Sequence, residues 1–331
     1  MLHTSYYGGR FHHVKPCLDD HSGVVGLIQV EGIIPAMVTP FTDDGKIHEA
    51  VLRRMVRRFL DAGVSGLFCL GTNGEFYSLS EDEKVRVTAI VADEADGKVP
   101  VYAGAGAIST DETVRLASQL ERAGADALSV ITPYFLSFTQ QELYEHYVRI
   151  AESTRLPIVL YNIPSRTSNT LHPKTVAKLA EIPNIVGLKD SSGSFDLTLQ
   201  YIDQTPDTFA VLAGTDSLIL ATLMAGGKGA VAATANVFPA EVVSIYRHWK
   251  EQRFREAEEA QRLLRDLRAS FSLGTLPSVL KAVLTEIGLS VGPARRPVAP
   301  LTDSALAHVK EMVASYERRG LIRRKSGTDT I

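Results

Sequence analysis

The chain has 331 residues, of which 45% are hydrophobic and 22% charged, an ordinary composition for a globular protein. Its 35 basic and 38 acidic residues leave a net charge of -3, so no overall field favours nucleic acid or an anionic membrane, and we expect a small-molecule partner. No stretch approaches the roughly 20 apolar residues of a membrane span, the N-terminus does not read as a secretory signal, and the two cysteines are too few for a disulfide framework. We therefore expect a cytoplasmic protein.

Residues 1–28 show no clear hydrophobic period and are interpreted as an extension outside the fold. The segment contains four scattered histidines, namely His3, His12, His13 and His21. No group of Cys and His in the chain has the spacing of zinc ligands, so no metal site is predicted here.

From Gly32 onward one pattern repeats: a short run rich in Val, Ile and Leu, a turn, and an amphipathic helical stretch. The runs predict eight strands, at Ile33–Met37, Gly66–Leu70, Val101–Ala103, Leu128–Ile131, Ile158–Tyr161, Val186–Leu188, Ala210–Leu212 and Ala230–Ala232. Ser80–Glu83 has the pattern of a capping box, and Ala62-Gly63 and Ala123-Gly124 are typical helix ends. Strands separated by helices run parallel, and eight such units close naturally, so we predict an α/β fold with a TIM (β/α)8 barrel over residues 29–235.

Three further helical segments follow the eighth strand, at Phe254–Arg268, Val279–Ile287 and Asp303–Arg319, with a Pro-rich stretch between the last two. Because they have no strands to cover, we predict a C-terminal helical annex over residues 236–322 that packs on the barrel, followed by a polar tail over 323–331.

In a TIM barrel the catalytic groups lie at the C-terminal ends of the strands. Three predicted strands end in polar residues, at Gly71-Thr72-Asn73-Gly74-Glu75, at Tyr161-Asn162-Ile163-Pro164-Ser165-Arg166-Thr167 and at Lys189-Asp190. A lysine at the end of an apolar strand points into the barrel mouth, where desolvation frees its amine as a nucleophile for imine chemistry. Tyr161, on the adjacent strand, could then move protons for Lys189.

The other two groups could bind the acid functions of a keto acid and its partner. The backbone amides of Gly71 and the hydroxyl of Thr72 could hold a carboxylate, and Arg166 could clamp a second one. Each residue alone also has a plain explanation, since a lone lysine is usually solvated and Thr-Asn-Gly is a common turn. Their conjunction on neighbouring strand ends favours a Schiff base with a 2-keto acid.

A dinucleotide site is not predicted. Gly104-Ala105-Gly106 lacks the third glycine and the distant acid of the nucleotide fingerprint, and Gly226–Gly229 precedes a strand where a phosphate loop would follow one.

From about Gly32 to Ile287 the chain resembles the dihydrodipicolinate synthase and N-acetylneuraminate lyase family of pyruvate-dependent class I aldolases. The motifs that carry the resemblance are Gly71-Thr72-Asn73-Gly74-Glu75, Thr132-Pro133-Tyr134, Tyr161-Asn162-Ile163-Pro164-Ser165-Arg166-Thr167 and Gly187-Leu188-Lys189-Asp190. The resemblance implies an imine between Lys189 and pyruvate, Tyr161 as proton donor and acceptor, and Thr72 on the pyruvate carboxylate. It also implies that Val231 lines the pyruvate site through its backbone and that Arg166 receives the carboxylate of an aldehyde such as aspartate semialdehyde. A homotetramer is implied, and no cofactor or metal.

Two positions depart from the usual synthase pattern. Asn73 stands where synthases carry a second threonine, and Phe135 where they carry a tyrosine of the proton relay. These residues are closer to lyases that act on 4-hydroxy-2-oxoglutarate or 2-keto-3-deoxy sugar acids, whereas Arg166 favours a synthase. The activity expected first is therefore dihydrodipicolinate (4-hydroxy-tetrahydrodipicolinate) synthase, with those aldolases as the alternative. A keto-acid-binding barrel without catalysis is the alternative from another class.

Overall fold

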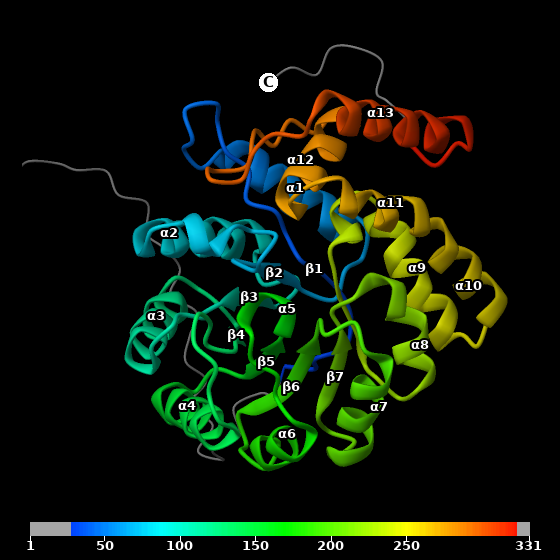
Figure 1. Cartoon of the computed structure of the whole chain (residues 1–331). Coiled ribbons are helices and arrows are strands. Elements are labelled where there is room, and N and C mark those ends of the chain that lie inside the picture. The colour runs from blue at the N-terminus through cyan, green and yellow to red at the C-terminus, as the bar shows by residue number, and fades with distance from the viewer. Residues whose placement is uncertain (1–27, 323–331) are drawn as a thin grey trace, which may run out of the picture.

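Eight parallel strands form the centre of the molecule in the computed structural model, which describes residues 28–322 (Figure 1). They are β1 (Gly32–Pro35), β2 (Leu67–Cys69), β3 (Val101–Gly104), β4 (Ala127–Ile131), β5 (Ile158–Asn162), β6 (Ile185–Asp190), β7 (Ala210–Ala213) and β8 (Gly229–Ala232). Hydrogen-bonded neighbours run in the order β1-β8-β7-β6-β5-β4-β3-β2. A parallel bridge between Ala36 and Phe68 joins the two remaining edges, so the predicted TIM barrel is confirmed.

A ring of helices surrounds the strands. The helices that follow the eight strands in turn are α1 (Glu49–Asp61), α2 (Glu81–Ala95), α3 (Thr110–Arg122), α4 (Gln140–Ser153), α6 (Pro173–Leu179), α7 (Phe195–Gln204), α8 (Ile219–Met224) and α9 (Pro239–Lys250). Shorter pieces precede some of them, namely η1 (Phe76–Ser78), α5 (Pro164–Thr167), η2 (Asp216–Leu218) and η3 (Thr234–Asn236). The capping box is confirmed, because the Ser80 side chain accepts from the Glu83 N–H and the Glu83 carboxylate accepts from the Ser80 N–H. Gly63 and Gly124 end their helices with positive φ, as predicted.

The barrel interior and the strand–helix layer are two separate hydrophobic clusters. Side chains such as Ile34, Phe68 and Tyr102 fill the interior, and Val159 and Val231 complete it. The alternate residues of the same strands point outward to a larger cluster beneath the helices. This alternation decides which side chains can reach the barrel mouth.

The C-terminal segment contains α10 (Phe254–Leu263), α11 (Arg265–Ser270), η4 (Phe271–Leu273), α12 (Leu276–Glu286) and α13 (Asp303–Arg318), which lie across one side of the barrel in Figure 1. The prediction of one helix over Phe254–Arg268 is wrong, because the helix breaks at Leu264. The hydroxyl of Tyr316 accepts from the Leu267 N–H at 3.0 Å and donates to the Leu263 carbonyl at 2.8 Å. It thus takes the place of the helical bond between those two residues.

The predicted domain limits stay a prediction. α9 begins after residue 235 and packs against β1 as the eighth helix of the ring, while α12 begins three residues earlier than expected, with a proline in its first turn. The N-terminal extension through residue 27, with its four histidines, and the tail from residue 323 lie outside the described residues. Among the helices of residues 28–322, none is long and apolar enough to cross a membrane.

Candidate active site

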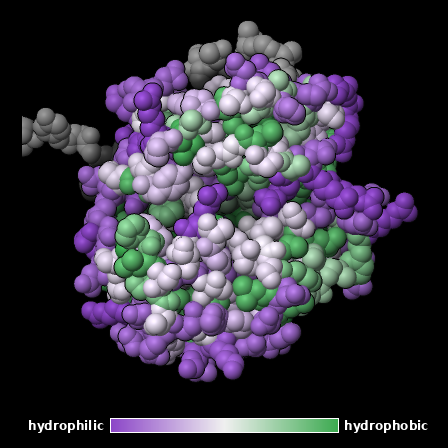
Figure 2. Space-filling view, viewed as in Figure 1, coloured by the Kyte–Doolittle hydropathy of each residue, from purple (hydrophilic) through white to green (hydrophobic). Residues whose placement is uncertain are grey.

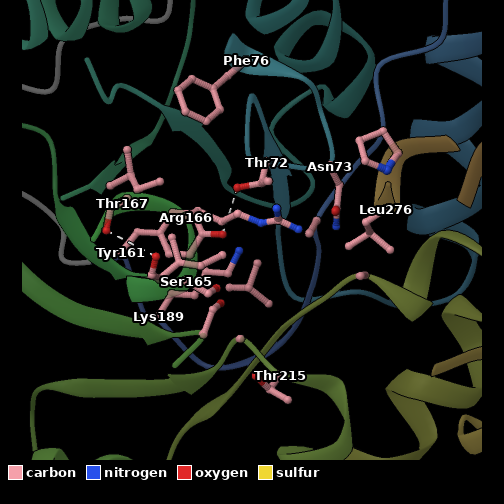
Figure 3. Close-up of a pocket in the computed structure, with 18 of the residues that line it drawn as sticks. Thr72, Asn73, Phe76, Tyr161, Ser165, Arg166, Thr167, Lys189, Thr215 and Leu276 are labelled. Atoms are coloured by element: carbon pink, nitrogen blue, oxygen red, sulfur yellow. Dashed lines mark hydrogen bonds between the residues drawn. The ribbon is translucent and has the colours of Figure 1, made fainter. Parts of the chain in front are cut away.

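The strands β5 and β6 lie side by side, and their register pairs Tyr161 with Lys189. The Lys189 Nζ atom lies 4.0 Å from the centre of the Tyr161 ring and 4.8 Å from that of Phe68. Only 4% of Lys189 and 4% of Tyr161 are exposed, and within residues 28–322 the lysine amine has no ion pair or hydrogen bond. The structure therefore brings together a buried, unpaired amine and a phenol (Figure 3).

Lys189 belongs to β6, whereas the sequence predicts that this strand ends at Leu188. The backbone ladder continues because Lys189 and Asp190 pair with β5 on one side and with β7 on the other. β6 also contains a register irregularity, since Ile158 pairs with Ile185 but the next residue of β5 pairs with Gly187. The extra residue changes the alternation of the strand.

The irregularity determines the direction of the Lys189 side chain. Val186 packs with the barrel interior, and strict alternation from there would turn Leu188 inward and Lys189 outward. Instead Leu188 packs in the outer cluster, and Lys189 lies over the rings of Tyr161 and Phe68 at the cavity.

Asp190 fixes the end of β6 without neutralising the lysine. Its carboxylate accepts from Asn162 Nδ2 at 3.0 Å, from the Ser192 N–H at 3.0 Å and hydroxyl at 2.9 Å, and from the Thr198 hydroxyl at 2.8 Å. Asn162 is also its register partner on β5. These buried bonds hold the two strands at the register that sets Tyr161 beside Lys189.

The turn after β2 brings a hydroxyl to the tyrosine. Thr72 Oγ1 lies 3.2 Å from the Tyr161 hydroxyl, within hydrogen-bond distance. Gly71 allows the close approach, because a Cβ atom at this position would lie 2.7 Å from the Phe68 ring. Asn73 is buried and lines the same cavity.

Arg166 extends into the cavity from α5, a single turn between β5 and α6 (Figure 3). The turn is anchored by its neighbour Thr167, whose hydroxyl accepts from Thr132 at 2.8 Å and donates to the Asn169 carbonyl at 3.1 Å. Arg166 itself is exposed at the rim, so its guanidinium is available to a ligand.

These residues line one cavity of about 610 Å³, and the space-filling view in Figure 2 shows a hollow near the centre of this face. The charged residues of its lining are Lys189, Arg166, Arg268 and Asp216. The Asp216 carboxylate is occupied, because it accepts the N–H groups of Ala233 at 3.2 Å and Thr234 at 2.6 Å. The guanidinium groups of Arg166 and Arg268 therefore favour an anionic substrate.

The structure places every predicted site residue at this cavity or, for Gly71, in the turn that borders it. Val231 lines the cavity from β8. Sequence reasoning missed several lining residues, namely Thr215, Asp216, Arg268, Leu276, Pro277 and Val298. Thr215 and Asp216 directly follow β7, so the signal of polar residues after a strand could have found them. The others belong to the annex, and no local pattern marks them.

Two further residues are not part of this cavity lining. Phe135, at the position of a relay tyrosine, is not in the cavity lining of this chain, and 85% of it is exposed. Cys69 is a buried thiol, and burial raises its pKa to about 12, so it stays protonated and is a poor nucleophile. Among residues 28–322, no group of three or more His, Cys, Asp or Glu side chains could hold a metal ion.

A model of the dihydrodipicolinate synthetase family matches residues 29–316. The chain belongs to this family. A family member from Methanopyrus kandleri, named 4-hydroxy-tetrahydrodipicolinate synthase, is 45% identical over 272 residues, which are 82% of this chain and 91% of that protein. An uncharacterized DapA-like lyase from Halobacterium salinarum is 38% identical over 285 residues, or 86% of this chain and 93% of that one. A similar fold is found in the crystal structure of YagE, a prophage protein of the dihydrodipicolinic acid synthase family from E. coli K12, in complex with pyruvate. The two sequences are 31% identical, and the structures superpose with a TM-score of 0.84 over 87% of this chain and 99% of the YagE chain.

The family resemblance predicted from the motifs is thus confirmed. The dihydrodipicolinate synthetase family consists of class I lyases, whose mechanism proceeds through a Schiff base, so this chain is an enzyme of that class. This result argues against the alternative of a barrel without catalysis.

The bonds around Asp190 give a test of the register that holds the site. In Asp190→Asn one acceptor becomes an NH2 group that faces donors, so we expect a loss of about 1–3 kcal/mol in the free energy of unfolding. Turnover should also fall, because a shift of the end of β6 would move Lys189, which lies on that strand. Denaturant unfolding and steady-state assays would measure both effects, and the exposed Asp43→Asn serves as control. A variant as stable and active as the parent would contradict this role.

Proposed function

We propose that this enzyme condenses pyruvate with aspartate semialdehyde, as a 4-hydroxy-tetrahydrodipicolinate synthase, through an imine on Lys189. The observation that carries the proposal is the buried Lys189 amine, unpaired within residues 28–322, that lies 4.0 Å from the centre of the Tyr161 ring, whose hydroxyl is 3.2 Å from Thr72 Oγ1. A relative with that name at 45% identity supports the substrate, and the two guanidinium groups of the cavity suit two acids.

The reaction would begin when the Lys189 amine attacks the keto carbon of pyruvate. The resulting carbinolamine loses its hydroxyl as water, and the imine forms. Tyr161 is placed to give a proton to that hydroxyl, and Thr72, 3.2 Å from the phenol, can carry the proton that the next step releases. Loss of a methyl proton from the imine then gives an enamine.

In the second half the enamine carbon attacks the aldehyde carbon, and a carbon–carbon bond forms while the aldehyde oxygen takes up a proton. Attack on the imine carbon by the amino group that aspartate semialdehyde carries, or by water, then breaks the bond to Lys189, releases the product and restores the lysine amine. Arg166, at the rim, would hold the carboxylate of the aldehyde. No step requires an oxidant or a reductant.

The alternative is an aldolase for 4-hydroxy-2-oxoglutarate or 2-keto-3-deoxy sugar acids. Asn73 favours it, because an amide that lines the cavity can bind substrate hydroxyl groups in place of a relay threonine. Both activities share the imine and differ in the electrophile. Turnover of pyruvate with aspartate semialdehyde, glyoxylate, glyceraldehyde and N-acetylmannosamine would separate them.

Borohydride reduction in the presence of pyruvate tests the imine. We expect a stable adduct on the peptide that contains Lys189, and none in Lys189→Arg. Tyr161→Phe should form the adduct more slowly but reach it at equilibrium, and should lower turnover by about 10²-fold or more, because it removes the proton shuttle. Mass spectrometry and kinetics measure the two effects. Absence of an adduct at Lys189 in the parent enzyme would contradict the imine mechanism.

Substitution of Arg166 tests the choice of aldehyde. In Arg166→Ala we expect KM for aspartate semialdehyde to rise by about 10-fold to 100-fold, since a charge-assisted pair contributes about 1.5–3 kcal/mol. Glyceraldehyde, which has no carboxylate, is the matched substrate and should be affected little. An equal rise in KM for both aldehydes would show that Arg166 does not bind the carboxylate.

We also propose a homotetramer. Phe135 and Leu136 are 85% and 58% exposed, and Phe135 has a φ of +84°, which is uncommon outside glycine. Tyr134, the residue before Phe135, packs edge-on against Phe76, which lines the cavity. Sedimentation should give the mass of four chains, and charged residues at 135 and 136 should lower it. A monomeric parent would contradict the proposal. The cytoplasmic location stays a prediction.

A further inference from the structure

Lys281 and Glu75 form an ion pair that is withdrawn from solvent. Lys281 Nζ lies 2.6 Å from Glu75 Oε1, and only 2% and 0% of the two side chains are exposed. Lys281 also donates to the Pro293 carbonyl at 3.0 Å and lies 4.1 Å from the centre of the Phe41 ring. The other carboxylate oxygen of Glu75 accepts the Arg295 N–H at 2.8 Å. Two charges leave water at a high cost, so a buried pair with this geometry points to a role other than general stability.

Glu75 is the last residue of the turn that carries Thr72 and Asn73. Its φ of +56° lies in the left-handed region, which a residue with a side chain seldom adopts unless its surroundings hold it there. The Glu75 N–H donates to the Thr72 carbonyl at 3.2 Å, and the Gly74 carbonyl accepts from the Thr39 hydroxyl at 2.7 Å. The turn is short and closed on itself, so a shift of Glu75 moves Thr72.

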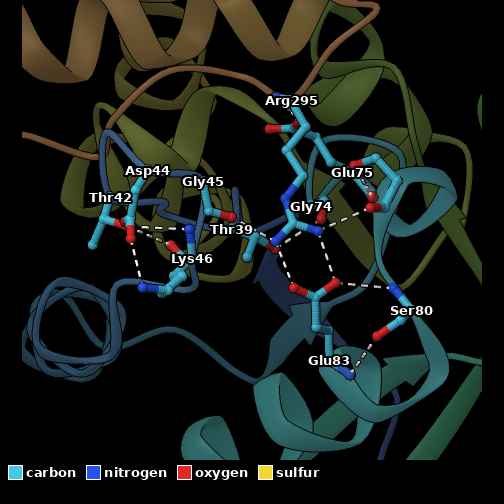
Figure 4. Close-up of polar contacts among 11 residues, drawn as sticks. Thr39, Thr42, Asp44, Gly45, Lys46, Gly74, Glu75, Ser80, Glu83 and Arg295 are labelled. Carbon is cyan, nitrogen blue, oxygen red and sulfur yellow. Dashed lines mark hydrogen bonds and ion pairs between the residues drawn. The ribbon is translucent and has the colours of Figure 1, made fainter.

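A second clamp ties the segment after α12 to the same region (Figure 4). The Arg295 guanidinium binds both carboxylate oxygens of Glu83, at 2.7 and 2.5 Å. It also donates to the carbonyls of Ser78 and Gly45, at 2.9 and 2.7 Å. Glu83 completes the capping box of α2 from the first turn of that helix, so the clamp reaches the helix that follows the turn.

The helix that carries Lys281 also forms part of the cavity wall. Leu276 and Pro277, in the first turn of α12, line the cavity, and so does Val298, three residues after Arg295. The C-terminal segment therefore meets the site from two directions: it supplies wall residues, and its buried lysine holds the turn after β2.

We propose that Lys281 and Glu75 are positioning residues, which hold the Thr72 hydroxyl against Tyr161 and so serve proton transfer at the imine rather than imine formation. This inference rests on the proposed function. The inference concerns a different step from the attack by Lys189. Lys189 lies on another strand and needs no contact with the turn to attack a keto acid.

Burial lowers the pKa of Lys281 to about 8, an effect that the nearby Arg295 adds to and the Glu75 carboxylate opposes. The variants are compared with the parent at one fixed pH near 7. Lys281→Met removes the cation with little change in length, and Glu75→Gln removes the anion with little change in shape. Lys250→Met is the matched control, because that lysine is 62% exposed and lies 3.5 Å from Glu31.

The test separates the imine from the proton step. Borohydride trapping with pyruvate measures the imine, and exchange of the pyruvate methyl protons for deuterium, followed by NMR, measures the proton step without any aldehyde. In both variants we expect trapping within about twofold of the parent and exchange lowered by about 10-fold to 100-fold, since small misplacements of catalytic groups cost this much. The double variant should be no slower than the worse single one.

Each other outcome overturns the inference. A folded variant with exchange within twofold of the parent and only a lower melting temperature would make the pair purely structural. A folded variant that loses trapping as well would show that the pair serves the whole site. If Lys281→Met does not fold, the result with Glu75→Gln is used instead. If neither variant folds, the pair is required for folding of the barrel and the inference is overturned. A parent without trapping at Lys189 would overturn the proposed function too, whereas trapping in the parent with normal exchange in the variants overturns this inference alone.

Discussion

The pairing of β5 with β6 is the constraint on which the site depends. Tyr161 and Lys189 are register partners, and the side chains of Asn162 and Asp190 join the next pair of residues by a hydrogen bond of 3.0 Å. A shift by one residue would turn every following side chain of the strand to the other face. The irregularity in β6 is therefore as important as the lysine itself, because it turns Leu188 outward and the amine toward the cavity.

Two buried lysines, Lys189 and Lys281, differ in their partners. Lys189 lies in the cavity lining with two aromatic rings as neighbours, and no carboxylate among residues 28–322 is bonded to its amine, which leaves the amine available for chemistry. Lys281, in contrast, has a carboxylate at 2.6 Å and a carbonyl at 3.0 Å, so its donors are used for structure. The difference between the two lysines follows from their partners, since both are almost fully buried.

The annex belongs to the site as much as to the scaffold. Its residues Leu276, Pro277 and Val298 close one side of the cavity, and Arg268 adds a guanidinium to it. Arg268 lies on α11, the short helix that begins after the break at Leu264. The hydroxyl of Tyr316, from the last helix, occupies that break. The position of a cavity cation is thus linked to a residue 48 positions later in the chain.

The sequence by itself determined the barrel, because each βα unit is marked locally by a hydrophobic run, a turn and a helix cap. It also predicted the candidate reactive residues, since polar side chains that interrupt an apolar pattern at strand ends are visible in one dimension. It could not determine which way Lys189 points, because local alternation gives no sign of the extra residue in β6. Nor could it bring Lys281 to Glu75 or Arg268 to the cavity. These contacts join segments about 80 to 200 residues apart, and only the closed barrel with its packed annex makes them neighbours.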